Sequence, residues 1–406
     1  METAVAKARL EVYQAEVEKE LYSILDFWMR HASDTRNGGF VGKMDNQGQV
    51  DYDAPKGSVL NARILWTFAA AYRHTGETNY LAMADRAFDY VLQHFLDKNF
   101  GGVYWSVTAT GEPLNTRKQI YALAFMIYGL SEYYLATQKA EALQVCQELF
   151  RWVEQYSFDP EQGGYLEAFS REGALLDDLR LSEKDRNDPK TMNTHLHILE
   201  AYANLYRIWP DAQLATQLEH LIKVFLEHII DPDTAHLKLF FSKDWIPAAD
   251  LVSYGHDIEA SWLLVEAAVV LGKEELIERS KEVAVAMANA TTEGLQADGS
   301  LYHELDKATN HYDTHREWWV SAEAMVGFLN AYQLTNNGSF LEHSQNAWEF
   351  ARKHLIDKEQ GEWLWGVFDD YSPMQEEDKI GFWKCPYHNA RVCLEVMYRC
   401  DSLLLV

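Results

Sequence analysis

The sequence predicts an all-α protein, an (α/α)6 barrel of about twelve helices arranged as six helical hairpins with short β-like turns. Two observations support this prediction. Apolar residues recur three and four positions apart along most of the 406 residues, which is the spacing of amphipathic helices. A tight turn, usually rich in glycine and followed by a short apolar run, returns about every 60 to 70 residues.

The six turns divide the chain into similar units. They lie at residues 37–42, 101–105, 163–166, 235–237, 298–302 and 361–365. Between successive turns the spacing predicts two helices, for example over 58–73 and 79–96, and over 120–134 and 139–156. A peripheral amphipathic helix is expected before them, over 12–29. Helical pairs that cannot bury an apolar face alone must stack, so the units form an open solenoid or a closed ring.

The alternation of two helix types favours the closed ring. Six helices are rich in apolar and aromatic residues and are expected to be the inner ones: 60–72, 120–134, 194–206, 261–271, 320–332 and 390–404. The alternate helices, such as 276–287 and 340–354, carry more charge on one face. An open array would need polar capping repeats. We therefore predict one catalytic domain over residues 1–406, with the charged segment 174–191 as a long functional loop.

The composition excludes several classes of partner. A formal net charge of −26 at pH 7 argues against binding to nucleic acid or to an anionic membrane surface. The sequence has neither a run of about 18 apolar residues nor a secretory leader pattern, so we expect a cytoplasmic protein without a membrane span. The four cysteines form no C-x-x-C pair, so neither a zinc site nor a disulfide framework is indicated.

Polar and aromatic residues cluster where the expected inner helices begin. In a closed barrel these helix starts line one mouth, and each buried polar group without a partner would cost about 1 to 3 kcal/mol. We therefore expect a shared pocket. The candidates are Asn61, Arg63, Arg117, Lys118, Tyr121, Asn193, His195, His197, His256, Glu259, Trp318, Trp319, Glu323, Trp383, His388, Asn389 and Arg391.

Two histidines among these candidates suit proton transfer. His256 precedes Glu259 by three positions, so on a helix the carboxylate would lie on the same face and orient the imidazole. His388 follows an aromatic segment that Pro386 fixes. Imidazole titrates near pH 6.5 and can both take and give a proton at neutral pH. Arg63 is either half of a structural ion pair or a donor aimed at a developing oxyanion.

Other chemistries leave these residues unexplained. His195 and His197 are two positions apart, so on a helix they point apart and cannot bind one metal ion; His195 is expected to be structural. Glycoside hydrolysis needs two carboxylates, and Asp185, Glu259 and Glu323 are available, but the histidines would then have no role. The sequence contains no phosphate-binding loop, dinucleotide fingerprint or nucleophile elbow. We expect no cofactor and no metal.

Three segments together resemble the cellobiose 2-epimerases of the N-acylglucosamine 2-epimerase superfamily, with the mannose 2-epimerases also close: residues 254–262, 317–324 and 382–389. The resemblance implies an (α/α)6 barrel. It also implies an isomerase that interconverts the gluco and manno configurations at C2 of the reducing-end residue of cellobiose and related β-1,4 disaccharides. The sugar ring opens, C2 loses its proton to give a cis-enediolate, and the proton returns on the other face.

The resemblance also assigns roles by motif. It implies that His256 and His388 are the acid/base pair, that Glu259 supports His256, and that His197 assists ring opening. By the same resemblance, Arg63, Tyr121 and Asn193 hold the oxygens that gain charge, Trp319 and Trp383 are sugar platforms, and Asp185 contacts the substrate. Ser321 stands where family members often carry Gln.

Several alternatives stay open at this point. They are a mannose or glucose 2-epimerase that acts on monosaccharides, an aldose–ketose isomerase that returns the proton to C1, and a non-enzymatic sugar-binding barrel. A disaccharide would need a second subsite near residues 174–191 and 243–253, where Trp245 would be its platform or its wall. The expected partner is a small sugar, and the expected assembly is a monomer or homodimer.

Overall fold

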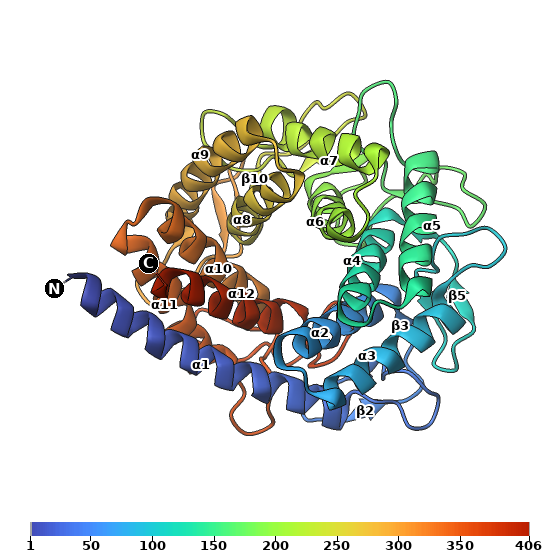
Figure 1. The fold of residues 1–406 in the computed structure, drawn as a ribbon, viewed down its shortest axis with the longest axis horizontal. Coiled ribbons are helices and arrows are strands. Elements are labelled where there is room, and N and C mark those ends of the chain that lie inside the picture. Colours follow the sequence, from blue (N-terminus) through green and yellow to red (C-terminus); the bar gives the residue numbers. More distant parts are fainter. Residues whose placement is uncertain (1, 406) are drawn as a thin grey trace.

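Twelve α-helices form two concentric rings in the computed structural model, which describes residues 2–405 (Figure 1). The inner helices are α2 (Ser58–Thr75), α4 (Ile120–Thr137), α6 (Met192–Ile208), α8 (Tyr254–Leu271), α10 (Trp318–Thr335) and α12 (Tyr387–Leu404). The outer helices are α1 (Glu2–His31), α3 (Thr78–Tyr90), α5 (Ala140–Tyr156), α7 (Ala212–Val224), α9 (Glu274–Thr291) and α11 (Gly338–Phe350). Each inner helix packs against the next, and α12 packs against α2, so the ring is closed.

This closure confirms the predicted (α/α)6 barrel. The inner helices are apolar because neighbours cover them on nearly every side; α4, for example, is buried from Ile120 to Tyr133. The outer helices bury one face only, as α5 shows by its alternation of buried and exposed residues. Short π-helical turns η1 (Val91–Phe95), η2 (Phe225–Ile229) and η4 (Ala351–Leu355) extend α3, α7 and α11, and the 3-10 turn η3 (Thr292–Gly294) follows α9. No helix within residues 2–405 is long and apolar enough to cross a membrane. That the whole chain forms one domain stays a prediction.

Several predicted helix starts were late. Helix α8 begins at Tyr254 rather than at residue 261, and α12 begins at Tyr387 rather than at residue 390. The residues left out of the predicted inner helices include polar ones, such as His256 and His388, which interrupt the apolar pattern. They lie inside the first turns of these helices because the interior of the ring accommodates them.

Short antiparallel strands hold the inner helices in place at one mouth of the barrel. They are β1 (Lys43–Met44), β2 (Val50–Asp51), β3 (Lys56–Gly57), β4 (Ser106–Val107), β5 (Pro113–Asn115), β6 (Lys118–Gln119), β7 (Ala168–Phe169), β8 (Lys190–Thr191), β9 (Phe240–Phe241), β10 (Leu251–Ser253), β11 (Glu304–Asp306), β12 (His311–Asp313), β13 (Arg316–Glu317) and β14 (Gly366–Val367). Strands β3, β6, β8, β10 and β13 lead directly into α2, α4, α6, α8 and α10. Each pairs with a strand of the following unit, at β4, β7, β9, β11 and β14. The start of each of these helices is therefore fixed by the neighbouring unit.

Buried lysine–aspartate pairs join the turns to these strands. Lys118 Nζ lies 2.9 Å from Asp97 Oδ2, and both side chains are fully buried. The same pairing occurs between Lys56 and Asp34 at 2.8 Å, Lys190 and Asp159 at 3.0 Å, and Lys379 and Asp357 at 2.5 Å. A buried charge without a partner would cost several kcal/mol, so each lysine is compatible with the interior only because of its aspartate. Lys118 was expected in the pocket, and its ion pair assigns it to this scaffold instead.

Candidate active site

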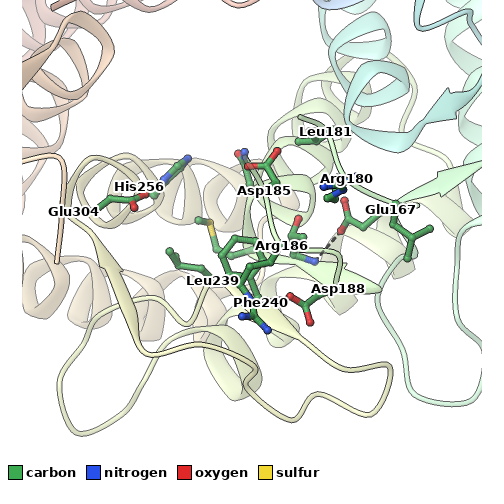
Figure 2. Close-up of a pocket in the computed structure, with 14 residues that line it drawn as sticks. Glu167, Arg180, Leu181, Asp185, Arg186, Asp188, Leu239, Phe240, His256 and Glu304 are labelled. Carbon is green, nitrogen blue, oxygen red and sulfur yellow. Dashed lines mark hydrogen bonds and ion pairs between the residues drawn. The ribbon is translucent and has the colours of Figure 1, made fainter. Parts of the chain in front are cut away.

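A cavity of about 580 Å³, part of it open to solvent, lies at the strand-lined mouth. Three of the predicted site residues line it: Asp185, Asn193 and His256. Figure 2 shows Asp185, from the charged loop, between His256 with Glu304 on one side and Glu167 on the other. The side-chain oxygen of Asn193 is buried and has no hydrogen-bond partner among the described residues. The predicted functional loop therefore contributes to this cavity.

His256 is held by a serine and not by the predicted glutamate. Its Nδ1 lies 2.8 Å from Ser253 Oγ, while Glu259 Oε1 accepts a hydrogen bond from Arg391 at 2.8 Å. The sequence-based pairing of His256 with Glu259 was therefore wrong, although both residues are in the same helix. The ring of His256 packs against Trp319, with 4.7 Å between ring centroids. Burial, and to a smaller extent the nearby His197, lower the pKa of His256 to about 3.

His388 has the carboxylate partner that His256 lacks. Glu323 Oε1 lies 2.7 Å from His388 Nδ1, and Glu323 Oε2 accepts a hydrogen bond from Trp262 Nε1 at 3.0 Å. Burial lowers the pKa of His388 to about 3 in spite of the ionised Glu323 beside it. His388 also packs against Trp319, at 5.9 Å between centroids. The two histidines thus share one tryptophan neighbour.

Arg391 connects three buried glutamates around these histidines. It donates to Glu200 Oε2 at 2.7 Å, and its other terminal nitrogen donates to Glu259 Oε1 and Glu323 Oε1 at 2.8 Å each. Burial alone would raise the pKa of Glu323, but Arg391 and His388 together lower it to about 2. Burial and the charge on Glu323 raise the pKa of Glu259 well above its usual range. The Arg391 guanidinium thus contacts the ionised Glu323 and also Glu259, whose raised pKa favours the protonated carboxyl.

His197 pairs with Glu200, three positions later on the same helix, which is the kind of pair that was predicted for His256 and Glu259. Its Nδ1 lies 2.6 Å from Glu200 Oε1, and Glu200 Oε2 also accepts from the Tyr387 hydroxyl at 2.8 Å. Burial lowers the pKa of His197 well below its usual value, and Arg63 adds to that effect. Glu200 was not among the residues predicted from the sequence. The spacing from His197 to Glu200 is the signal that would have identified it.

Arg63, Tyr121 and Trp383 form a neighbouring group. Arg63 Nη2 donates to Tyr121 Oη at 2.9 Å, and its guanidinium lies 4.1 Å from the ring centroid of Phe125. No carboxylate pairs with Arg63 among the described residues, so the ion-pair alternative finds no support. The ring of Tyr121 is 4.8 Å from His197 and 5.8 Å from Trp383. This group lies next to the histidines.

Trp319 is fixed by its own hydrogen bond and by a close helix. Its Nε1 donates to Glu317 Oε2 at 2.5 Å, and Glu317 Oε1 accepts from Trp365 Nε1 at 3.0 Å. A Cβ on Gly255 would lie 2.6 Å from the Trp319 ring, so only glycine allows α8 to approach it this closely. This contact explains the glycine in the segment Tyr254-Gly255-His256.

Other sequence candidates are parts of the scaffold. His195 bridges Thr191 O at 2.6 Å and Tyr165 N at 2.9 Å, which confirms the structural role expected for it. Asn389 donates to Glu362 Oε1 at 2.6 Å. Trp245 is buried against the ring of His228, so it is a packing residue rather than an exposed platform. The Asn61 amide donates to Gly57 O at 2.8 Å within its own helix start.

Two clusters carry enough donor atoms to be considered as metal sites. They are His303 with His315 and Glu317, and Glu259 with Glu323 and His388. The second already contains Arg391, whose positive charge occupies the place of a cation. In the first, burial opposes protonation of His315, but Glu317 and Asp313 raise its pKa to about 9. A metal ion in the first cluster would therefore have to displace a proton from His315.

Comparison with known proteins agrees with this geometry. The family model described as N-acylglucosamine 2-epimerase (GlcNAc 2-epimerase) matches residues 38–390. The chain belongs to the N-acylglucosamine 2-epimerase family. This epimerase family is a family of isomerases, and the match confirms both the resemblance seen in the three segments and the prediction of an isomerase.

Several relatives within the N-acylglucosamine 2-epimerase family are similar over nearly their whole length. The cellobiose 2-epimerase of Bacteroides fragilis is 51% identical over 388 residues, which cover 95% of this chain and 99% of that protein. The cellobiose 2-epimerase of Dictyoglomus turgidum is 41% identical over 394 residues, 96% of this chain and 99% of that protein. The solved structure of cellobiose 2-epimerase from Bacillus thermoamylovorans superposes with a TM-score of 0.91 at 40% identity, covering 96% and 100% of the two chains.

Proposed function

We propose that this epimerase interconverts the gluco and manno configurations at C2 of the reducing-end residue of cellobiose and related β-1,4 disaccharides. The observation that carries the proposal is the pair His256 and His388. Each is held through Nδ1, and both pack against the same indole, that of Trp319. The similarity to several cellobiose 2-epimerases supports the choice of substrate.

In the proposed reaction the two histidines act on opposite faces of C2. One neutral imidazole takes the C2 proton through Nε2, and the C–H electron pair forms the enediolate. Rotation about C2–C3 presents the other face, and the second histidine, in its protonated form, transfers the Nε2 proton to C2 and becomes neutral. No electrons are gained or lost overall, so the reaction needs no redox cofactor. The lowered pKa values favour the neutral form of the histidine that acts as the base, and they make the protonated form of its partner a strong acid.

Arg63 and its neighbours are proposed to stabilise the negative charge that develops on the sugar oxygens. A proton next to an aldehyde is weakly acidic, so its removal depends on donors that meet the growing negative charge on oxygen. Arg63 has no carboxylate partner among the described residues, and its terminal nitrogen already orients the Tyr121 hydroxyl. We assign Arg63, Tyr121 and Asn193 to the sugar oxygens, and His197, held by Glu200, to ring opening.

The remaining assignments concern the shape of the site. Trp319 and Trp383 are the proposed platforms for sugar C–H faces, and Asp185 is a contact from the loop above the cavity. We reassign Glu259 from a partner of His256 to a carboxyl that completes the Arg391 cluster. The proposed substrate is a small sugar, and the chain is expected to work without a metal or cofactor.

An assay of three sugars tests the proposal. Purified protein is incubated with cellobiose, glucose and mannose, and products are separated at intervals. We expect cellobiose to yield its mannose-ended epimer without accumulation of a ketose. His256→Ala and His388→Ala should each reduce the rate by about 100- to 10,000-fold, the usual range for a proton-transfer group. His31→Gln, an exposed histidine on α1, is the control. Conversion of monosaccharides alone, or a ketose as main product, would favour the alternatives named above.

A further inference from the structure

We propose that Ser253 is the positioning residue of His256, and that it makes the two proton-transferring histidines unequal. This inference rests on the proposed function, because it concerns the same pair of histidines. Ser253 is the last residue of β10 and the residue just before α8. Its Oγ lies 2.8 Å from His256 Nδ1, which leaves Nε2 of the imidazole for the substrate.

The Ser253 side chain does not cap helix α8. At the position before a helix, a serine hydroxyl ordinarily accepts a hydrogen bond from the backbone N–H two or three residues later. Ser253 makes no such capping bond, although its position is the standard one. Its hydroxyl contacts the side chain of His256 instead. The Ser253 hydroxyl is therefore used to hold the imidazole of His256 and not to stabilise the start of α8.

The hydroxyl is held in place from several sides. Ser253 is fully buried, and its backbone pairs with Glu304 in the β10–β11 ladder. Trp319 covers one side of the His256 ring at a centroid distance of 4.7 Å. Because the backbone of Ser253 and one side of the ring are both fixed, the hydroxyl defines how the imidazole is rotated.

The other histidines of the site use carboxylates in this position. Glu323 faces Nδ1 of His388, and Glu200 faces Nδ1 of His197, at 2.7 and 2.6 Å. An ionised carboxylate can only accept, so it requires a proton on Nδ1 and stabilises the imidazolium. A hydroxyl can accept or donate and carries no charge. Glu323 therefore holds the hydrogen of His388 on Nδ1, whereas Ser253 can accept from or donate to Nδ1 of His256, and this makes the two histidines unequal.

Three serine variants test this assignment. Ser253→Ala removes the hydroxyl, Ser253→Thr keeps one, and Ser261→Ala is a matched control. Ser261 is also buried in α8, but its hydroxyl is bonded to Ile258 O at 2.7 Å within the helix. We expect Ser253→Ala to lower kcat for epimerisation about 10- to 100-fold with KM nearly unchanged, the usual cost of losing the partner that orients a functional histidine. Ser253→Thr should regain most of the rate, and Ser261→Ala should match the wild type.

A spectroscopic readout separates positioning from mere stability. In protein labelled with 15N-histidine, the ring nitrogens of His256 are identified by their loss in His256→Gln. We expect their shifts to change in Ser253→Ala and to stay near wild type in Ser261→Ala. An unchanged His256 spectrum, a kcat within twofold of wild type, or a rise in KM alone would overturn the proposal. If the wild-type protein epimerises no sugar, the proposed function fails, while the spectrum still reports whether Ser253 orients His256.

Discussion

Glu323 Oε1 lies 2.7 Å from His388 Nδ1, although the two residues are 65 positions apart and belong to different inner helices. The carboxylate is ionised, since Arg391 and His388 outweigh burial and lower its pKa to about 2. An ionised carboxylate only accepts hydrogen bonds, so Nδ1 of His388 carries the hydrogen. The lone pair of the neutral imidazole is therefore on Nε2, where a base needs it.

Glu323→Gln tests this relationship. The amide can donate a hydrogen to Nδ1 and so stabilise the tautomer that has no lone pair on Nε2. We expect kcat to fall roughly 100-fold or more, while the protein stays folded. Initial rates of cellobiose epimerisation measure the effect, and Glu342→Gln, an exposed glutamate on α11, is the control. A rate for Glu323→Gln equal to that of the control would show that His388 does not depend on this carboxylate.

The pH dependence of kcat/KM gives a second prediction. A base must be neutral, and protonation of both His256 and His388 would leave the site without one. Because burial lowers both pKa values to about 3, we expect the acid limb of the profile to fall well below pH 6.5, the value for an unperturbed imidazole. Rates are measured at pH values where circular dichroism shows native protein. A limb centred near pH 6.5 would contradict these lowered pKa values.

His315 predicts a different pH effect, on stability. Burial opposes its protonation, but Glu317 and Asp313 raise its pKa to about 9, above the value near 6.5 expected in the unfolded chain. A raised pKa contributes stability that is complete below about pH 6.5 and is lost as the pH rises through about 9. We therefore expect His315→Gln to lower the free energy of unfolding more at pH 6 than at pH 10. Urea denaturation of both proteins, with exposed His311→Gln as control, measures the difference. An equal effect at both pH values would argue against the ion pair.

One turn of the repeat carries a residue that is unfavourable there. Ala235 has φ of 59°, and its N–H bonds to Asp231 O, as Gly101 and Gly163 bond to Asp97 and Asp159 in their own turns. A left-handed conformation costs a residue with a Cβ roughly 1 to 2 kcal/mol, and glycine avoids this cost. We expect Ala235→Gly to raise the free energy of unfolding by about 1 kcal/mol, with some of the gain offset by the greater freedom of glycine when unfolded. Urea denaturation tests this, and a loss of stability would contradict it.

Much of the fold could be predicted because its signals are local and repeated. The turns at Gly101 and Gly163 and the apolar helices between them define a unit that recurs six times along the chain. The helix starts were less predictable, because His256 and Glu259 interrupt an apolar pattern where the ring interior accepts polar groups. The lysine–aspartate pairs, such as Lys118 with Asp97, were also missed, since a buried lysine in a short strand resembles a surface lysine in sequence.

The site was predictable as a set of residues and less so as a set of contacts. The i, i+3 rule was applied to His256 and Glu259, but it is His197 and Glu200 that pair in this way. The spacing of residues along one helix does not show that Arg391, on the last inner helix, donates a hydrogen bond to Glu259. The contact of Glu323 with His388 joins two helices as well, so only the closed ring brings these residues together.

The most direct test of the two-histidine account is epimerisation of cellobiose in D2O, followed by NMR of the product. We expect one deuterium at C2 of the mannose-ended product, no deuterium at C1 and no accumulated ketose. The product from wild type and from the control His31→Gln should be labelled alike, and His256→Ala and His388→Ala should form almost none. Product without deuterium at C2, or a ketose labelled at C1, would contradict the account.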